Sequence, residues 1–253
     1  MRSTLLALLV ALGTAISAAQ PPTRFEVASI RAHRGTGGVN AITTQPGGRF
    51  LVLNFPLQDV IEVAFDIRPF QLLDAPRWIQ TERFDINALT GRDEDLTMVG
   101  ARPLIQTLLA DRFQLDIERE RRIMKTYSLL RTRADAHGPA LKRATGCKSA
   151  SEKEDQNLPA CGLRVDAQGL VGVGMNLRGL AYTLTGLLNT IVEDQTGLTE
   201  LFDFTLRFNR DPTAPDSVSI FTALQEQLGL KLEPRDAPVD VIVVKRIERP
   251  TEN

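Results

Sequence analysis

Residues 177–206 decide the fold with the stretch LRGLAYTLTGLLNTIVEDQTGLTELFDFTL, and residues 57–88 repeat its pattern as LQDVIEVAFDIRPFQLLDAPRWIQTERFDINA. Both stretches predict an amphipathic helix, a short apolar strand that ends in an aspartate, a turn and an alternating strand. An offset of 120 residues places Leu177 on Leu57, and after a two-residue slip in the turn the last strands also correspond. The pattern therefore predicts a structural unit that occurs twice.

A second helix and two further strands complete each copy. In the first copy, Pro103 opens a helix, and alternating residues at 114–118 and 125–130 predict a hairpin. An offset of 115 residues places the last strands of the chain on this hairpin. The predicted unit is β-α-β-β-α-β-β, and residues 46–133 are expected to superpose on residues 164–247.

Each predicted helix has a single apolar stripe, which Leu57, Val60 and Ala64 form in the first of them. Such helices cover one face of a sheet and leave the other face to solvent. We therefore predict an α+β fold of two tandem units, with helices on one face of mainly antiparallel sheets.

Four segments differ in composition. Residues 1–19 have a positive start, an apolar run and small residues before a cleavage point, which predicts a signal peptide. Residues 20–133 are the first repeat with an N-terminal strand, residues 134–163 a polar linker, and residues 164–253 the second repeat with a short tail. No later stretch is apolar enough for a transmembrane segment, so we expect an extracytoplasmic protein, periplasmic or secreted.

The bulk composition is that of a globular protein. The chain has 253 residues, an apolar fraction of 43% and a formal net charge of −1. A nucleic-acid partner is not expected, because such proteins carry a strongly basic surface.

The two cysteines, Cys147 and Cys161, both lie in the predicted linker. An even pair in an oxidising compartment predicts a disulfide. A zinc site is a poor alternative, because tetrahedral zinc needs three or four protein ligands. We expect this disulfide to tether the linker rather than to hold either core together.

Nucleotide and histidine chemistry find little support in the motifs. Gly172 and Gly174 precede a helix as in a dinucleotide fingerprint, but Leu177 replaces the third glycine. His33 and His137 lie in polar loops, and no Gly-x-Ser-x-Gly motif accompanies them, although a triad can assemble from distant residues. We predict no cofactor and no metal site.

Four carboxylates recur in both copies: Asp85 with Asp203 on strands, and Asp74 with Asp194 at strand ends. Paired carboxylates can hydrolyse a glycosidic bond when they lie about 5–9.5 Å apart. Aspartate at a strand end is also ordinary turn chemistry, and the chain has only one Trp and two Tyr for a sugar platform.

Basic residues are frequent between residues 118 and 133. Such a stripe can bind an anionic polymer or lipid head groups. The alternative is the solvated face and turn of the predicted hairpin, where charges also discourage edge-to-edge aggregation.

Several segments carry a family resemblance. They are FEVASI at 25–30, GRFLVLNFPLQDVI at 48–61, APRWI at 75–79, LLADRFQL at 108–115, DQTGLTELFDFTL at 194–206 and the closing SIFTALQEQLGLKLEPRDAPVDVIVVKRIERPTEN at 219–253. Together they resemble the DUF3738 family of exported proteins, which occurs in many paralogous copies in Acidobacteria and has no established activity. Because related modules occur on membrane-bound peptidases of the antirepressor kind, the resemblance implies sensing or interaction. At the level of fold, the helix, strand and turn also resemble short domains of secretins and TonB-dependent receptors.

The function we expect is that of an exported, non-enzymatic interaction or sensory module for an envelope protein or peptide. The alternative is a periplasmic hydrolase or carbohydrate-active enzyme that uses the recurring carboxylates. Arg77 and Trp78 lie in a turn whose counterpart, residues 196–198, is smaller, and both types are enriched at interfaces. They are a candidate partner surface, and the alternative is that Trp78 plugs the end of its own sheet.

Overall fold

The computed structural model of this protein describes residues 24–35, 37–91, 93, 95–134, 137–148, 159–166, 168–209 and 218–250. The predicted signal peptide, residues 1–19, lies outside the described residues. The chain divides into two compact units. Unit 1 comprises Met1–Ala64, Glu82–Phe113 and Pro250–Asn253, and unit 2 comprises Phe65–Thr81 and Gln114–Arg249.

Both units combine helices with antiparallel strand pairs, which confirms the predicted α+β class. The units do not coincide with the predicted repeats, because residues 65–81 and 114–133 of the first repeat belong to unit 2. The two predicted repeats therefore do not correspond one to one with the two compact units.

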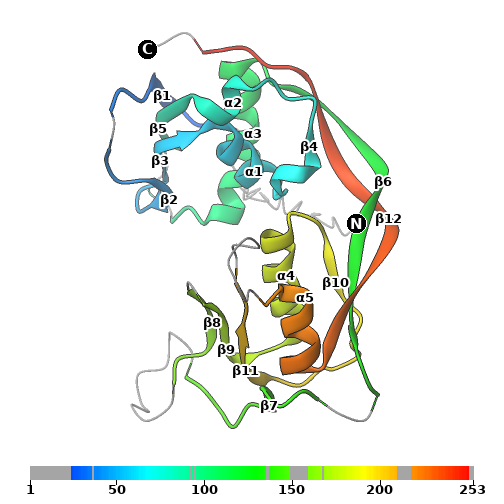
Figure 1. The fold of residues 1–253 in the computed structure, drawn as a ribbon. Coiled ribbons are helices and arrows are strands. Elements are labelled where there is room, and N and C mark those ends of the chain that lie inside the picture. The colour runs from blue at the N-terminus through cyan, green and yellow to red at the C-terminus, as the bar shows by residue number, and fades with distance from the viewer. Residues whose placement is uncertain are drawn as a thin grey trace, which may run out of the picture. The chain divides into compact units, whose positions relative to one another are not determined.

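Unit 1 contains a four-stranded antiparallel sheet in the order β1-β5-β3-β2 (Figure 1). Its strands are β1 (Val27–Ala32), β2 (Ala41–Gln45), β3 (Arg49–Pro56) and β5 (Arg83–Leu89). Every second residue of β5 is buried, so one face of the sheet carries the core. Two helices complete the unit, α1 (Leu57–Phe65) and α3 (Met98–Phe113).

Helix α3 is longer than predicted. The expectation that Pro103 opens it is wrong, because α3 begins at Met98 and contains Pro103. Pro103 is the sixth residue of α3, so it removes the one backbone donor that would bond to the carbonyl of Val99, while its φ is one that the helix already requires. The buried residues Leu104, Ile105 and Leu108 then supply the predicted apolar stripe.

Unit 2 contains a second four-stranded antiparallel sheet in the order β7-β11-β9-β8. Its strands are β7 (Leu141–Arg143), β8 (Gly162–Asp166), β9 (Gly169–Met175) and β11 (Phe202–Arg207). Helices α4 (Leu177–Leu188) and α5 (Ile220–Ala223) accompany it, and α5 continues into a π-helical turn (Leu224–Leu228). Strand β7 lies inside the predicted linker, so part of that segment is a strand of the sheet.

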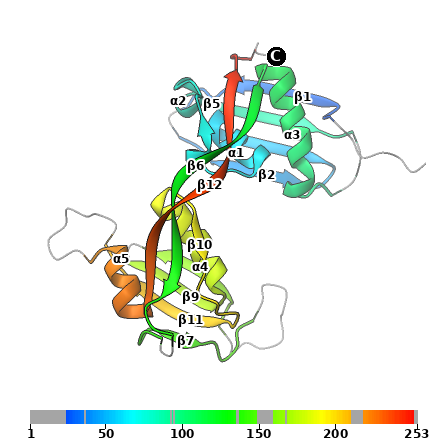
Figure 2. The same cartoon turned by 90° about the vertical axis from the view of Figure 1, so that its right-hand side faces the viewer.

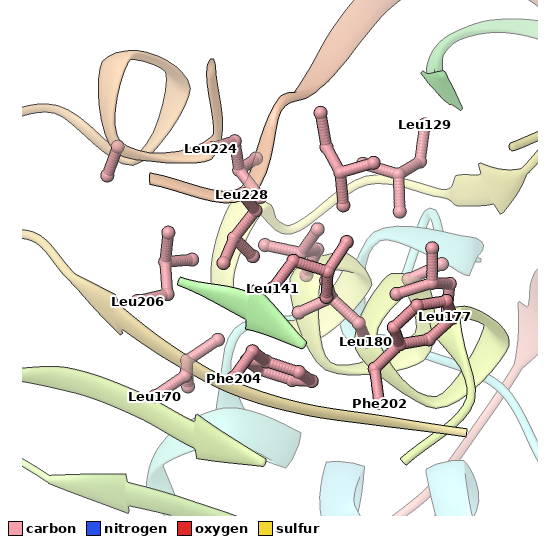
Figure 3. Packing of buried hydrophobic residues seen from close by; sticks show 14 of the residues in the cluster. Leu129, Leu141, Leu170, Leu177, Leu180, Phe202, Phe204, Leu206, Leu224 and Leu228 are labelled. Atoms are coloured by element: carbon pink, nitrogen blue, oxygen red, sulfur yellow. The ribbon is translucent and has the colours of Figure 1, made fainter. Parts of the chain in front are cut away.

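The core of unit 2 forms between this sheet and its helices (Figure 3). Leu177 and Leu180 of α4 meet Phe202 of β11, and all three side chains are fully buried. Helix α4 starts where Asn176 accepts the N–H of Gly179 at 2.8 Å, which satisfies one of the donors at the helix start.

The other sheet of unit 2 is built on two long strands, β6 (Asp116–Arg131) and β12 (Leu230–Arg246), which run antiparallel side by side (Figures 1 and 2). The short strand β10 (Val192–Asp194) pairs in parallel with one end of β6. The shorter strand β4 (Leu72–Leu73) pairs in parallel with the opposite end of β12. A 3₁₀ turn (Pro69–Gln71) precedes β4, and helix α2 (Trp78–Thr81) follows it.

The predicted hairpin over residues 114–130 is wrong, because these residues form the single strand β6. Residues 119–124, Arg-Glu-Arg-Arg-Ile-Met, contain none of the Gly, Pro, Asn, Asp or Ser residues that favour a turn. The strand therefore runs straight through, and its antiparallel partner, β12, is supplied by the far end of the chain.

Candidate interaction surface

Two of the recurring carboxylates support β-bulges. The Oδ1 atom of Asp85 accepts the N–H of Asn54 at 2.9 Å, and Oδ1 of Asp203 accepts the N–H of Gly174 at 2.8 Å. Asn54 and Gly174 have φ values of 54° and 60°, and the strand register shifts at both places. Because a bulge leaves a backbone donor without a partner in the ladder, each carboxylate has a structural task.

The other two carboxylates lie far apart within unit 2. Their positions can be compared along β6. Asp194 lies beside Leu129 of β6. Asp74 follows Leu73, which lies beside Val243 of β12, and Val243 in turn lies opposite Glu118 of β6. At about 3.3 Å per residue along β6, these two ladder positions are about 35 Å apart. A glycosidase pair requires about 5–9.5 Å. Asp194 instead closes a turn by accepting the N–H and hydroxyl of Thr196 at 3.0 and 2.7 Å.

The sequence analysis missed one polar pair. His33 Nδ1 lies 3.0 Å from both carboxylate oxygens of Asp85, and the His33 side chain is 17% exposed. His33 and Asp85 meet because of the register in which β1 pairs with β5, and the sequence near either residue does not indicate that register. His137 instead places its ring 5.5 Å from that of Phe202. Among the described residues, no group of three or more His, Cys, Asp or Glu side chains is arranged to hold a metal ion.

Cys147 and Cys161 form a disulfide with a Cα–Cα distance of 5.0 Å. It links the segment after β7 to the segment before β8, and these strands are the two edges of their sheet. A Cβ atom added to Gly174 would lie 2.2 Å from the Cys147 sulfur, so the disulfide packs against the bulge of β9. The bridge therefore contacts the sheet as well as tethering its own segment.

The glycines before α4 have a packing role. A Cβ atom added to Gly172 would lie 2.4 Å from the ring of Phe204. At this position only glycine leaves room for the aromatic side chain on the neighbouring strand.

Arg77 and Trp78 stand at the start of helix α2 in unit 2. Arg77 is exposed, and Trp78 is half-buried with the guanidinium of Arg249 lying 4.9 Å from its ring centroid. The cation covers part of the indole, which is consistent with both interpretations of Trp78 made from the sequence.

The two faces of the β6–β12 pair differ sharply. On one face, Val239, Val241 and Val243 are buried and pack with Met124 and Leu73. Side chains alternate between the faces of a strand, so the residues between them point to the opposite side.

On that opposite side lies a surface that we call the ribbon face. It consists of Arg119, Arg121, Ile123 and Lys125 of β6 with Asp236, Pro238 and Asp240 of β12. Arg121 and Asp240 lie 3.0 Å apart, and Lys125 and Asp236 lie 2.9 Å apart. Ile123 is 71% exposed between these two ion pairs. Exposed ion pairs of this kind contribute about 0–1 kcal/mol, so they leave the surface able to exchange partners.

A pocket of about 600 Å³ adjoins the ribbon face where β12 meets the segment before β4. Its wall includes Phe65, over whose ring the guanidinium of Arg119 lies at 5.6 Å from the centroid. Gln71 donates from Nε2 to the carbonyl of Asp240 at 2.8 Å and closes one side. Aromatic, cationic and amide groups thus meet beside an exposed strand pair, which is a composition suited to binding polypeptide.

These features define a mixed α+β protein in which a long two-stranded ribbon carries an accessible polar surface. The chain belongs to the family described as "Protein of unknown function (DUF3738)", whose model matches residues 58–247. This match confirms the resemblance found in the sequence. Neither the curated proteins nor the solved structures contain a match to the chain. Across the described residues, no helix is both long and apolar enough to cross a membrane.

Proposed function

We propose that this protein is an exported, non-enzymatic interaction or sensory module whose partner is an envelope protein or peptide. The observation that carries the proposal is the ribbon face, where Ile123 is 71% exposed between two weak surface ion pairs. A single exposed apolar side chain needs no explanation, but here it lies on a strand pair and next to a pocket. This combination supports recognition of another polypeptide.

The alternative of a periplasmic hydrolase or carbohydrate-active enzyme gains no support from the recurring carboxylates. Asp85 and Asp203 accept bulge N–H groups, and Asp194 closes a turn. An acid that is committed to a local backbone donor is poorly placed to exchange protons with a substrate.

Export of the mature chain is the second part of the proposal. The Cys147–Cys161 disulfide supports it, because structural disulfides persist in oxidising compartments. Thiol labelling of unreduced protein recovered from the cell envelope tests this part. Protein in which both thiols react would argue for a reducing compartment.

We also propose that the fold derives from an internal duplication. Helices α1 and α4 begin at Leu57 and Leu177, and the buried residues of each follow the same spacing. The bulge carboxylates Asp85 and Asp203 make matching hydrogen bonds. These local likenesses support one ancestral unit with a hairpin of its own. In the present fold each copy instead pairs these strands with those of the other copy, as β6 does with β12.

Arg77 and Trp78 are proposed as a further part of the partner surface. The half-burial of Trp78 supports a mixed role, in which one side of the ring packs and the other is covered by Arg249. Trp78→Ala should lower partner capture by folded protein. A large loss of stability with unaltered capture would leave Trp78 as a packing residue.

Site-specific photo-crosslinking in intact cells tests the proposed function. A photoreactive residue replaces Ile123, and a control replaces Val165, which is 49% exposed on β8. The proposal expects one discrete adduct from Ile123, outcompeted by added wild-type protein, and no such adduct from Val165. Equal labelling from both positions, or none from Ile123, would refute the assignment of the ribbon face.

A further inference from the structure

One edge of strand β6 is open to another strand, and two hydrogen bonds just after the open stretch establish which way its backbone groups point. Tyr127 donates its N–H to the carbonyl of Ile191 at 2.8 Å, and the carbonyl of Lys125 accepts the hydroxyl of Thr190 at 2.6 Å. The backbone groups of Tyr127 and Lys125 thus point away from β12. Because this direction alternates along a strand, those of Ile123 and Arg121 point the same way, and so do those of Arg119.

The outer edge of β12 is closed by different means. The carbonyl of Asp240 faces outward and accepts the Gln71 side chain. By the same alternation, Pro234 and Pro238 occupy outward positions. Since proline has no N–H, this edge lacks two of the donors that an added strand needs.

The outer edge of β6 has no such protection between Arg119 and Ile123. None of its residues is proline, and within the part of the chain that the structure describes, no backbone hydrogen bond reaches the outward groups of Arg119, Arg121 or Ile123. This stretch directly continues the edge on which β10 is already paired.

We propose that this open edge of β6 binds an extended, acidic segment of a partner protein by strand addition. The inference rests on the proposed function and specifies the chemistry of its ligand. Main-chain hydrogen bonds to residues 119–123 would extend the sheet, and alternate side chains of the segment would lie beside the ribbon face. An apolar residue opposite Ile123 would be flanked by acids near Arg121 and Lys125, which gives the pattern acid-x-apolar-x-acid.

Charge selects this occupant over a second copy of the chain. Two β6 edges paired antiparallel about Ile123 would place Arg121 opposite Lys125 of the other copy, and pairing about Arg121 would oppose two arginines. Like charges directly opposite one another destabilise a strand pair. An acidic segment instead makes favourable cross-strand pairs with the same cations.

The test uses the full mature chain and a fluorescent peptide, TTETVTETT, whose binding is followed by anisotropy at low ionic strength. Two control peptides are the lysine version, TTKTVTKTT, and a scrambled sequence without the alternating pattern. The proposal expects saturable binding of the acidic peptide only, weakened by added salt. It also expects slower amide hydrogen exchange at Arg121 and Ile123 when the peptide is bound.

Two variants separate backbone from charge. Ile123→Pro removes one outward N–H, as Pro238 does on the other edge, and should weaken binding at least tenfold. The double variant Arg121→Glu with Lys125→Glu keeps every N–H and should reverse the preference, so that the lysine peptide binds. The reversed charge preference of the double variant tests the proposal even if the proline variant fails to fold. Arg164→Glu, on edge strand β8, is the matched control and should leave binding unchanged.

The proposal would be overturned if Arg164→Glu weakened binding of the acidic peptide as much as the double variant does, because the overall charge of the protein would then account for the affinity. Unchanged exchange at Arg121 and Ile123, or dimerisation through β6 in place of peptide binding, would overturn it too. A discrete crosslinked adduct from Ile123 without peptide binding would reject the acidic segment while the proposed function survives. Peptide binding without any crosslinked adduct in cells would support the acidic segment as a ligand and count against the proposed function.

Discussion

Replacing Asp203 by alanine should destabilise unit 2 because it removes the acceptor of the Gly174 N–H. That hydrogen bond is 2.8 Å long, it joins β11 to β9, and Asp203 is half-buried. A hydrogen bond to a charged group contributes about 1.5–3 kcal/mol, and partial access of water reduces this. We therefore expect Asp203→Ala to lower the free energy of unfolding by about 1–2 kcal/mol. Asp203→Asn keeps a neutral acceptor and should lose about half as much.

Urea denaturation provides the measurement, because the single tryptophan of the chain, Trp78, belongs to the same unit as Asp203. Amide hydrogen exchange at Gly174 gives a local readout, which the alanine variant should accelerate. Asp236→Ala is the matched control, since it removes a carboxylate that makes an exposed ion pair with Lys125. That control should change the free energy of unfolding by less than about 1 kcal/mol.

Unchanged protection of the Gly174 amide in Asp203→Ala, together with unchanged stability, would refute this reasoning. The carboxylate would then be free for another role, and the hydrolase alternative would regain its strongest candidate. The same reasoning applied to Asp85 predicts a similar loss in unit 1, because its acceptor bond to Asn54 has nearly the same length.

Three further predictions follow from burial, charge and the disulfide. Replacing Cys147 and Cys161 by serine should lower the free energy of unfolding by about 3 kcal/mol, as expected for a disulfide that closes a loop of about 15 residues. Denaturation under oxidising conditions measures this, and the prediction would be contradicted if reductant lowered the stability of the serine variant by the same amount. Burial raises the pKa of Asp59, against the opposing charge of Arg83, so the folded state binds this proton more tightly than the unfolded state. Asp59→Asn should therefore stabilise unit 1 at neutral pH, and the advantage should vanish as the pH falls through the raised pKa; a constant difference across a pH series would disprove the assignment. Leu180→Ala should cost about 2–5 kcal/mol because the side chain is fully buried, whereas its half-exposed control Leu201→Ala should cost far less by the same denaturation assay.

The elements that the sequence predicted well are those whose signal is local. The apolar stripe that Leu57, Val60 and Ala64 form predicted a helix there and a counterpart at Leu177, and α1 and α4 lie at these two places. The alternating strand predicted at the end of the stretch 57–88 is β5, Arg83–Leu89. Periodicity succeeds here because it records which side of an element faces the core.

The partners of the strands could not be predicted in the same way. Every residue other than proline offers the same backbone donor and acceptor, so alternation in residues 116–131 does not reveal whether they turn back or meet β12. The parallel pairs that β4 and β10 make, and the contact of His33 with Asp85, depend on this long-range register. The sequence offered the basic residues of β6 as an anion-binding stripe or as the face and turn of a hairpin, because their pairing with the acidic residues of β12 depends on the same register.

A partial signal for the pairing was nevertheless present in the prolines of the last strand. Pro234 and Pro238 are four residues apart, so in any extended strand their backbone nitrogens face the same edge. That edge lacks two donors and is the poorer side for a long ladder, which leaves the opposite edge of residues 230–246 as the paired one. Residues 116–131 contain no proline, so both of their edges can donate. One edge pairs with β12, and among the described residues the other edge pairs with β10 at residues 127–129, which leaves the open stretch where we place the partner strand.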